Sequence, residues 1–70
     1  MTKRIFSLGG DRIELTCNIV HVTDRAFLIR VDEQEEWIPK SQIEDSSYDE
    51  KLNITTLVIP EWLAIEKNLI

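Results

Sequence analysis

The alternation of apolar and polar residues predicts a chain composed mainly of short β-strands. In the clearest segment, the apolar positions are Ile13, Leu15, Cys17 and Ile19. Polar residues separate them, and this period of two is typical of a strand with one buried face. Beyond Ile19 the apolar face continues at Val20 and Val22, displaced by one residue. We therefore expect a β-bulge near Ile19–Val20 that keeps both halves of a long strand directed inward.

Turn-forming residues divide the rest of the chain into further strands. Gly9-Gly10, Asp24-Arg25 and residues 32–34 each lie between apolar segments, as tight turns do. The remaining strands are expected at residues 3–8, 26–31, 35–39 and 54–59. Pro39 has no N–H to donate, so strand pairing should stop there. Residues 40–42 should form a short 3₁₀ or turn segment.

Two segments near the end of the chain have different patterns. Residues 44–53 are polar and acidic without a clear apolar period, so we expect an exposed, mobile loop. Pro60 suits the first position of a helix and Asn68 suits a left-handed residue at its end, which predicts a helix over about residues 60–68. The residues on one face of this helix are Trp62, Ile65 and Leu69, with Leu63 beside them.

These elements predict a mainly β fold with a single domain, residues 1–70, since 70 residues suffice for one domain and no more. Four or five short antiparallel strands favour a small SH3-like barrel, and an OB-like arrangement is the alternative. The apolar face of the helix, with Trp62 as a lid, should cover one open end of the barrel. The expected core includes Leu15, Ile19, Leu28, Leu57 and Val58.

The charge of the chain is asymmetric. The formal net charge is −5, and the segment 32–50 contains eight carboxylates with a single cation, Lys40. Most other cations lie in the N-terminal half, at Lys3, Arg4, Arg12, Arg25 and Arg30. An acidic surface repels phosphate groups and attracts basic partners. The alternative is that these carboxylates only keep a small protein in solution.

No arrangement of catalytic or metal-binding residues is recognisable. The chain has one cysteine, Cys17, and one histidine, His21. On a strand they lie roughly 13 Å apart, too far for a nucleophile and its base, and a metal site needs three or four ligands. We therefore expect no enzyme activity, no cofactor, no metal ion and a buried Cys17. No apolar run is long enough for a membrane span or a signal peptide, so the expected location is the cytoplasm.

Residues 35–43 form the most distinctive segment, a strand that carries Trp37 and stops at Pro39. Trp37 is either a lid on the core or, where alternation directs it outward beside Lys40, an anchor for a partner. Because acidic residues flank it on both sides, we predict a partner-binding surface there. The candidate residues are Asp32, Glu33, Glu35, Glu36, Trp37, Pro39, Lys40, Glu44 and Asp45.

Segments 37–43 (Trp-Ile-Pro-Lys-Ser-Gln-Ile) and 58–64 (Val-Ile-Pro-Glu-Trp-Leu-Ala), followed by Glu66-Lys67, resemble a family of small bacterial, phage and mobile-element proteins. The resemblance extends from Ile19 onward, and Asn68 stands where members of that family often have glycine. It implies a phage or prophage origin and a small β-rich fold. The family has no established activity, so the resemblance implies no catalytic residues.

Two binding functions are consistent with these observations. In the first, a non-enzymatic phage or mobile-element accessory protein binds a basic surface of a host protein. In the limit its carboxylates would mimic DNA phosphates and inhibit a defence or nucleic-acid enzyme. In the alternative, Trp37, Phe27 and Tyr48 stack on bases of nucleic acid while basic residues contact phosphates. The net charge of −5 argues against this alternative. A third hypothesis is homo-oligomerisation through exposed strand edges.

Overall fold

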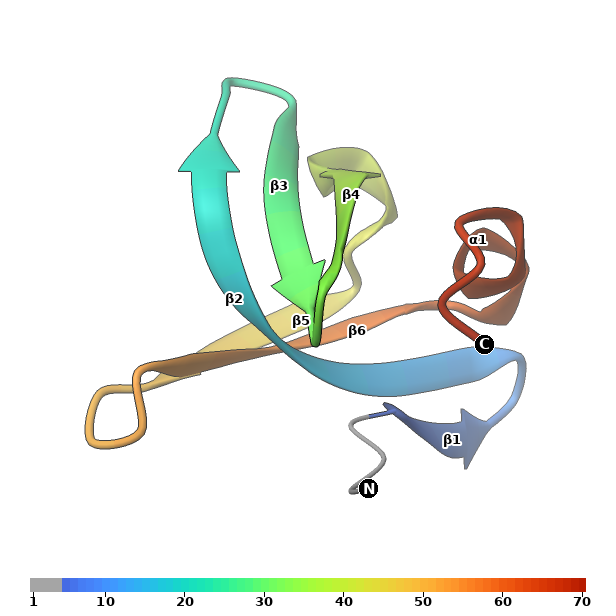
Figure 1. Ribbon diagram of the computed structural model, residues 1–70. Helices are drawn as coiled ribbons and strands as arrows, with labels where there is room; N and C mark the ends of the chain where they lie inside the picture. The colour runs from blue at the N-terminus through green and yellow to red at the C-terminus, as the bar shows by residue number, and fades with distance from the viewer. Residues whose placement is uncertain (1–4) are drawn as a thin grey trace.

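The computed structural model describes residues 5–70, which form six strands, a 3₁₀ turn and one short helix (Figure 1). The strands are β1 (Ile5–Gly9), β2 (Arg12–Val22), β3 (Ala26–Val31), β4 (Gln34–Pro39), β5 (Asp45–Asp49) and β6 (Ile54–Pro60). The 3₁₀ turn η1 spans Lys40–Gln42 and the helix α1 spans Glu61–Glu66. Residues 3 and 4, where the first strand is expected to begin, lie outside the described residues.

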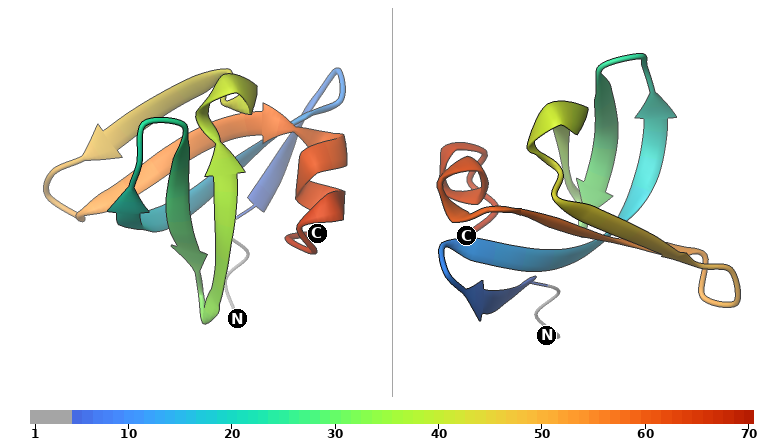
Figure 2. Two further views of the ribbon diagram at one scale, coloured as in Figure 1. Left: turned by 90° about the horizontal axis from the view of Figure 1, so that it is seen from above. Right: turned by 180° about the vertical axis from the view of Figure 1, so that it is seen from behind.

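The central strand is β2, which pairs with different neighbours along its two halves. Its first half pairs with β1 and β6, and its second half pairs with β3. The strand bends between these halves, so that β3 and β4 stand across β5 and β6 (Figures 1 and 2). The register shifts between Ile19 and His21, which leaves Val20 as the extra residue. This shift confirms the bulge predicted near Ile19–Val20.

The core lies between the two halves of the bent sheet. β2 and β6 contribute two buried cross-strand pairs, Ile13↔Ile59 and Leu15↔Leu57. The other buried residues are Cys17, Ile29, Val31, Ile38, Leu63 and Ala64. The prediction is thus confirmed for Leu15 and Leu57, and Ile19 packs partly buried against the core. It is wrong for Leu28 and Val58, which are only half-buried because alternation places them on outer faces of their strands.

The predicted turns are confirmed, and two of them use left-handed backbone. At the β1–β2 turn, φ is 78° at Gly9, 58° at Gly10 and 62° at Asp11. Asp32 begins the β3–β4 turn with φ of 57°. Glycine adopts this region freely, and aspartate tolerates it better than most residues. The end of β4 at Pro39 and the 3₁₀ turn after it are also as predicted.

The loop predicted at residues 44–53 is wrong over half of its length. Residues 45–49 form β5, which pairs with β6 from Asp45↔Val58 to Asp49↔Ile54. All five residues of β5 are exposed, so no apolar alternation marks the strand, and its partner β6 supplies the apolar residues. The connection to β6 is confined to residues 50–53, where the Asp49 carboxylate accepts the N–H groups of Lys51 and Leu52.

The predicted face of the helix is wrong for Trp62 and Ile65, whereas Leu69 packs partly buried against the core. Leu63 and Ala64 are buried, whereas Trp62 and Ile65 are each 54% exposed, so Trp62 is not a lid on the core. The helix has only six residues, fewer than two turns. Beyond it Asn68 is left-handed, with φ of 59°, and the Leu69 N–H returns to the Ala64 carbonyl at 2.8 Å. The spacing of a longer helix therefore does not apply to Leu69.

The strands form one open antiparallel sheet in the order β4-β3-β2-β6-β5, with β1 beside β2. A mainly β fold with a short C-terminal helix is thus confirmed, with six strands where four or five were predicted. Within residues 5–70, β4 and β5 remain unpaired with each other, so the sheet is not closed into a barrel. None of the helical segments in this range has the length and apolar character needed to cross a membrane.

Candidate binding surfaces

The acidic residues predicted to form one partner surface lie at three separate places. They occupy the β3–β4 turn (Asp32, Glu33), β4 (Glu35, Glu36) and the entry to β5 (Glu44, Asp45). Successive side chains of a strand point to opposite faces, so Glu35 shares the face of Trp37 and Glu36 does not. The fold therefore distributes these carboxylates rather than collecting them on a single surface.

Two of these carboxylates are paired with arginines. Arg30 Nη2 lies 2.8 Å from Glu35 Oε2, across the β3–β4 pair, and Arg12 Nη1 lies 3.9 Å from Glu44 Oε1. All four side chains are substantially exposed, so each pair contributes only about 0–1 kcal/mol to stability. The two ion pairs mainly change the local charge. The arginines partly neutralise Glu35 and Glu44, so a partner meets a less negative potential there than the sequence predicts.

Of the two placements left open for Trp37, the structure shows the outward one: Trp37 lies on the outer face of β4 and is 42% exposed. It faces Leu28 in the β3–β4 register, and Leu28 faces His21 in turn. The rings of His21 and Trp37 meet edge to face, with centroids 6.2 Å apart. We call His21, Leu28 and Trp37 the Trp37 face. It is an apolar patch on the outside of the sheet, so Trp37 is not a lid on the core.

Pro39 and Lys40 lie at the end of β4, where they join the β2–β3 turn. The Lys40 N–H donates to the Arg25 carbonyl at 2.7 Å. The Lys40 ammonium lies 5.0 Å from the centroid of the Phe27 ring, within the range of a cation–π interaction. Phe27 is directed to the inner side of the sheet, next to residues that point away from Trp37. The Lys40 side chain therefore lies beside Phe27 and not beside the Trp37 face.

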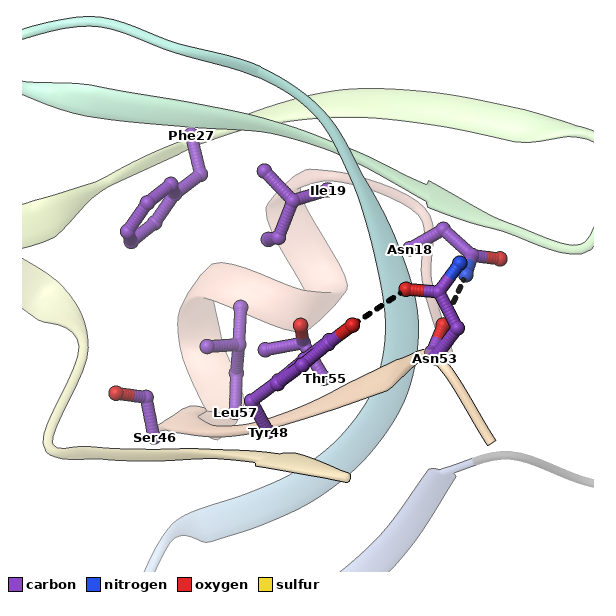
Figure 3. A pocket seen from close by; sticks show the side chains of 8 residues that line it. All are labelled: Asn18, Ile19, Phe27, Ser46, Tyr48, Asn53, Thr55 and Leu57. Atoms are coloured by element: carbon purple, nitrogen blue, oxygen red, sulfur yellow. Dashed lines mark hydrogen bonds between the residues drawn. The ribbon is translucent and has the colours of Figure 1, made fainter. Parts of the chain in front are cut away.

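A slot opens on the inner side of the bent sheet, between β2–β3 and β5–β6 (Figure 3). It encloses about 420 Å³. Phe27 and Ile19 form one wall, and Tyr48 with Leu57 forms the wall across from it. The full lining consists of Asn18, Ile19, Phe27, Ser46, Tyr48, Asn53, Thr55 and Leu57. Within residues 5–70, no charged residue lines this slot.

Hydrogen bonds hold the rim of the slot in place. The Tyr48 hydroxyl donates to Asn53 Oδ1 at 2.7 Å, and Asn18 Nδ2 donates to the Asn53 backbone carbonyl at 3.0 Å. Asn53 is left-handed, with φ of 54°, a conformation that asparagine tolerates. These bonds connect β2, β5 and the β5–β6 turn, so the Tyr48 ring is oriented although it is 60% exposed.

The sequence does not predict the slot, because residues 44–53 have no apolar period and are expected to form a loop. The slot depends on the pairing register of β5 with β6. Ser46 and Tyr48 alternate on β5, and they face Leu57 and Thr55 on β6. The hypothesis that Phe27, Tyr48 and Trp37 act together is only partly supported, because the fold unites the first two in the slot and places Trp37 on the opposite face of the sheet.

The remaining residue with reactive chemistry is Cys17, which is buried at 1% exposure, as predicted. Burial raises the pKa of its thiol from 9.0 to about 11. The thiolate is the nucleophilic form, so Cys17 is inert near neutral pH. Among residues 5–70, no three Cys, His, Asp or Glu side chains gather as ligands for a metal ion.

The geometry thus offers two surfaces for binding: the Trp37 face outside the sheet and the slot within its bend. Both are built from exposed aromatic rings on paired strands, and one lies beside carboxylates whereas the other is uncharged. No family model, no curated protein and no solved structure matches this chain.

Proposed function

We propose that this chain is a non-enzymatic binding protein that docks onto a basic protein surface through the Trp37 face. The observation that supports this most directly is the exposure of Trp37, 42%, on the outer face of a strand whose inner face buries Ile38. Tryptophan is the residue most enriched among those that dominate binding energy at interfaces. The Trp37 indole lies beside half-buried Leu28 and the exposed His21 ring, and aromatic residues are enriched at the centres of interfaces.

The charge around this face supports a basic partner. Asp32 and Glu33 lie in the turn at one end of β4, and Glu35 lies beside Trp37 on the same face. A rim of carboxylates accelerates encounters with a basic surface and suppresses encounters with acidic ones. Arg30 reduces this field through its pair with Glu35, so specificity would depend on the apolar centre, with the turn carboxylates steering the approach.

The resemblance of segments 37–43 and 58–64 to small phage and mobile-element proteins extends the proposal to a host partner in the cytoplasm, such as a defence or nucleic-acid enzyme. Strict mimicry of DNA by carboxylates receives less support, because the acidic residues occupy three places and two of them are paired with arginines. An SH3-like arrangement belongs to the same proposal: the bend in β2 and the 3₁₀ turn after β4 are compatible with a partly open barrel.

The proposal is tested by capture of a partner from host lysate with parent, Trp37→Ala and Trp62→Ala proteins. Trp62 is a matched control, since it is also an exposed tryptophan but lies on α1. We expect the same basic partner to be captured by the parent and by Trp62→Ala. Trp37→Ala should weaken its binding about 30-fold or more, the effect of losing one dominant interface residue.

A charge-reversed variant, Asp32→Asn with Glu33→Lys, separates steering from contact, because it changes the turn carboxylates and leaves Trp37 in place. Association with the captured partner should slow, and the difference from the parent should shrink as salt is added. Equal capture by parent, Trp37→Ala and the charge-reversed protein would contradict the proposal, and the carboxylates would then serve only to keep the protein in solution.

A further inference from the structure

We infer that the slot between β2–β3 and β5–β6 binds a nucleobase, presented either by a single nucleic-acid strand or by a free nucleotide. This site is separate from the proposed protein-binding function, because the slot lies on the inner side of the sheet and the Trp37 face lies outside it. Its two aromatic side chains come from strands that are distant in the sequence, Phe27 from β3 and Tyr48 from β5, and they line the same slot (Figure 3).

The shape and lining of the slot favour a flat, uncharged ring. Phe27 and Tyr48 lie on opposite walls, with Ile19 beside Phe27 and Leu57 beside Tyr48. A volume of about 420 Å³ lies in the range of small-ligand sites. Charged residues make up 30% of the chain, yet none lines the slot. The group that enters is therefore neutral, and stacking on aromatic rings is how proteins hold a base without reading its sequence.

Hydrogen bonds fix the side chains at the rim of the slot in the absence of a ligand. The Tyr48–Asn53 and Asn18–Asn53 hydrogen bonds fix the outer wall, so little side-chain freedom is lost when a ring stacks there. Ser46 and Thr55 add two hydroxyl groups to the lining, and a hydroxyl both donates and accepts hydrogen bonds. These groups suit the polar edge of a base, which carries donors and acceptors side by side.

The charges near the slot suit a phosphate attached to that base. The Lys40 ammonium lies over the Phe27 ring, and its backbone is bonded to Arg25 in the β2–β3 turn. Asp24 is the one carboxylate in that turn. On β5, alternation turns Asp45 and Asp49 away from Ser46 and Tyr48, which line the slot. The Lys40 cation at this end of the slot favours a nucleotide over a basic peptide.

The test is a titration of ¹⁵N-labelled protein followed by NMR, with an eight-residue oligothymidylate, thymidine monophosphate, a DNA duplex and a proline-rich decapeptide. We expect the oligonucleotide to shift the amides of Phe27, Tyr48 and Asn53 with a Kd of about 1–100 μM at low salt, as in sequence-independent binding. The duplex should not shift them, because its bases are already stacked. Shifts with the monophosphate at similar concentrations would identify the free nucleotide as the source, and shifts with the strand alone would identify the single strand.

Variants assign the binding to the slot. Tyr48→Ala should weaken oligonucleotide binding about tenfold or more, the effect of losing one stacking ring. Tyr48→Phe keeps the ring and loses only the hydrogen bond to Asn53, so it should weaken binding less than Tyr48→Ala does. Lys40→Gln should reduce the dependence of binding on salt. Leu52→Ala, at a more exposed apolar residue of the same hairpin, is the control. The inference is overturned by unshifted slot amides, by equal binding of Tyr48→Ala and parent, or by slot shifts with the decapeptide alone.

Discussion

Leu57 connects the core of the molecule to the slot. Its side chain is fully buried, it faces Leu15 on β2, and it also forms part of the slot wall. Because the Leu57 side chain packs between the core and the slot, shortening it leaves a cavity that neighbouring side chains fill only in part. Residues of this kind set how firmly the two halves of the bent sheet are joined.

Leu57→Ala should therefore lower the free energy of unfolding by about 2–5 kcal/mol, a large share of the stability of a small domain. Urea titration followed by tryptophan fluorescence measures the change. Leu52→Ala is the control, because Leu52 is 67% exposed and exposed substitutions usually change stability by less than about 0.5 kcal/mol. Superimposable melting curves for Leu57→Ala and the parent would show that the β6 register is wrong.

Cys17 gives the stability a dependence on alkaline pH. Burial raises the pKa of its thiol to about 11, against 9.0 for an exposed thiol. Between these values the unfolded chain releases the proton before the folded protein does, so the stabilising contribution is complete below pH 9 and is lost as pH rises toward 11. The free energy of unfolding should fall more steeply over this interval in the parent than in Cys17→Ala. Parallel curves for the two proteins would show that the thiol ionises equally in both states.

At the scale of elements, α1 illustrates how a short helix is oriented by its attachment. Pro60 begins it directly after β6, and the Glu61 N–H donates to the Asp11 carbonyl at 2.8 Å. This anchor turns Leu63 and Ala64 toward the core and leaves Trp62 outside. In a helix of six residues, this backbone attachment determines which face is buried, and the spacing of the apolar residues does not.

Two substitutions in adjacent residues test this orientation. Leu63→Ala should lower the free energy of unfolding by about 2–5 kcal/mol, as expected for a buried leucine. Trp62→Ala should change it by much less, since more than half of that side chain is exposed. Urea titration of both variants measures the difference. A larger loss for Trp62→Ala than for Leu63→Ala would restore the helix face predicted from the sequence.

The elements that could be predicted from the sequence are those marked by alternation or by turn residues. The long strand with its bulge, the glycine turn and the stop at Pro39 all belong to this group. β5 could not be predicted, because an edge strand with five exposed residues has no apolar period. Since β5 supplies Ser46 and Tyr48, the slot could not be predicted either.

At the scale of the whole molecule, the sequence predicts which residues belong to a binding surface, but only the fold shows which of them lie on the same face of the sheet. Alternation, which is a local property, left Trp37 either on the core or outward, and the structure places it outward. The grouping of six carboxylates with it was inferred from closeness in the sequence. The bend of the sheet and the arginines on neighbouring strands separate and partly neutralise that group.

The two-sided pairing of β2 has a consequence for how quickly the protein folds. The contacts of β2 with β3 and of β3 with β4 close short turns, so this meander can form early and locally. The pairing of β2 with β6, from Arg12↔Pro60 to Cys17↔Thr55, requires ends that are far apart in the sequence to meet, and the entropy of closing that loop is lost before the contacts compensate. We therefore expect formation of the β2–β6 ladder to be the slow step. Until it is complete, Leu57 is not packed against Leu15, the slot is not assembled, and the edge of β6 that pairs with β2 is open to other chains.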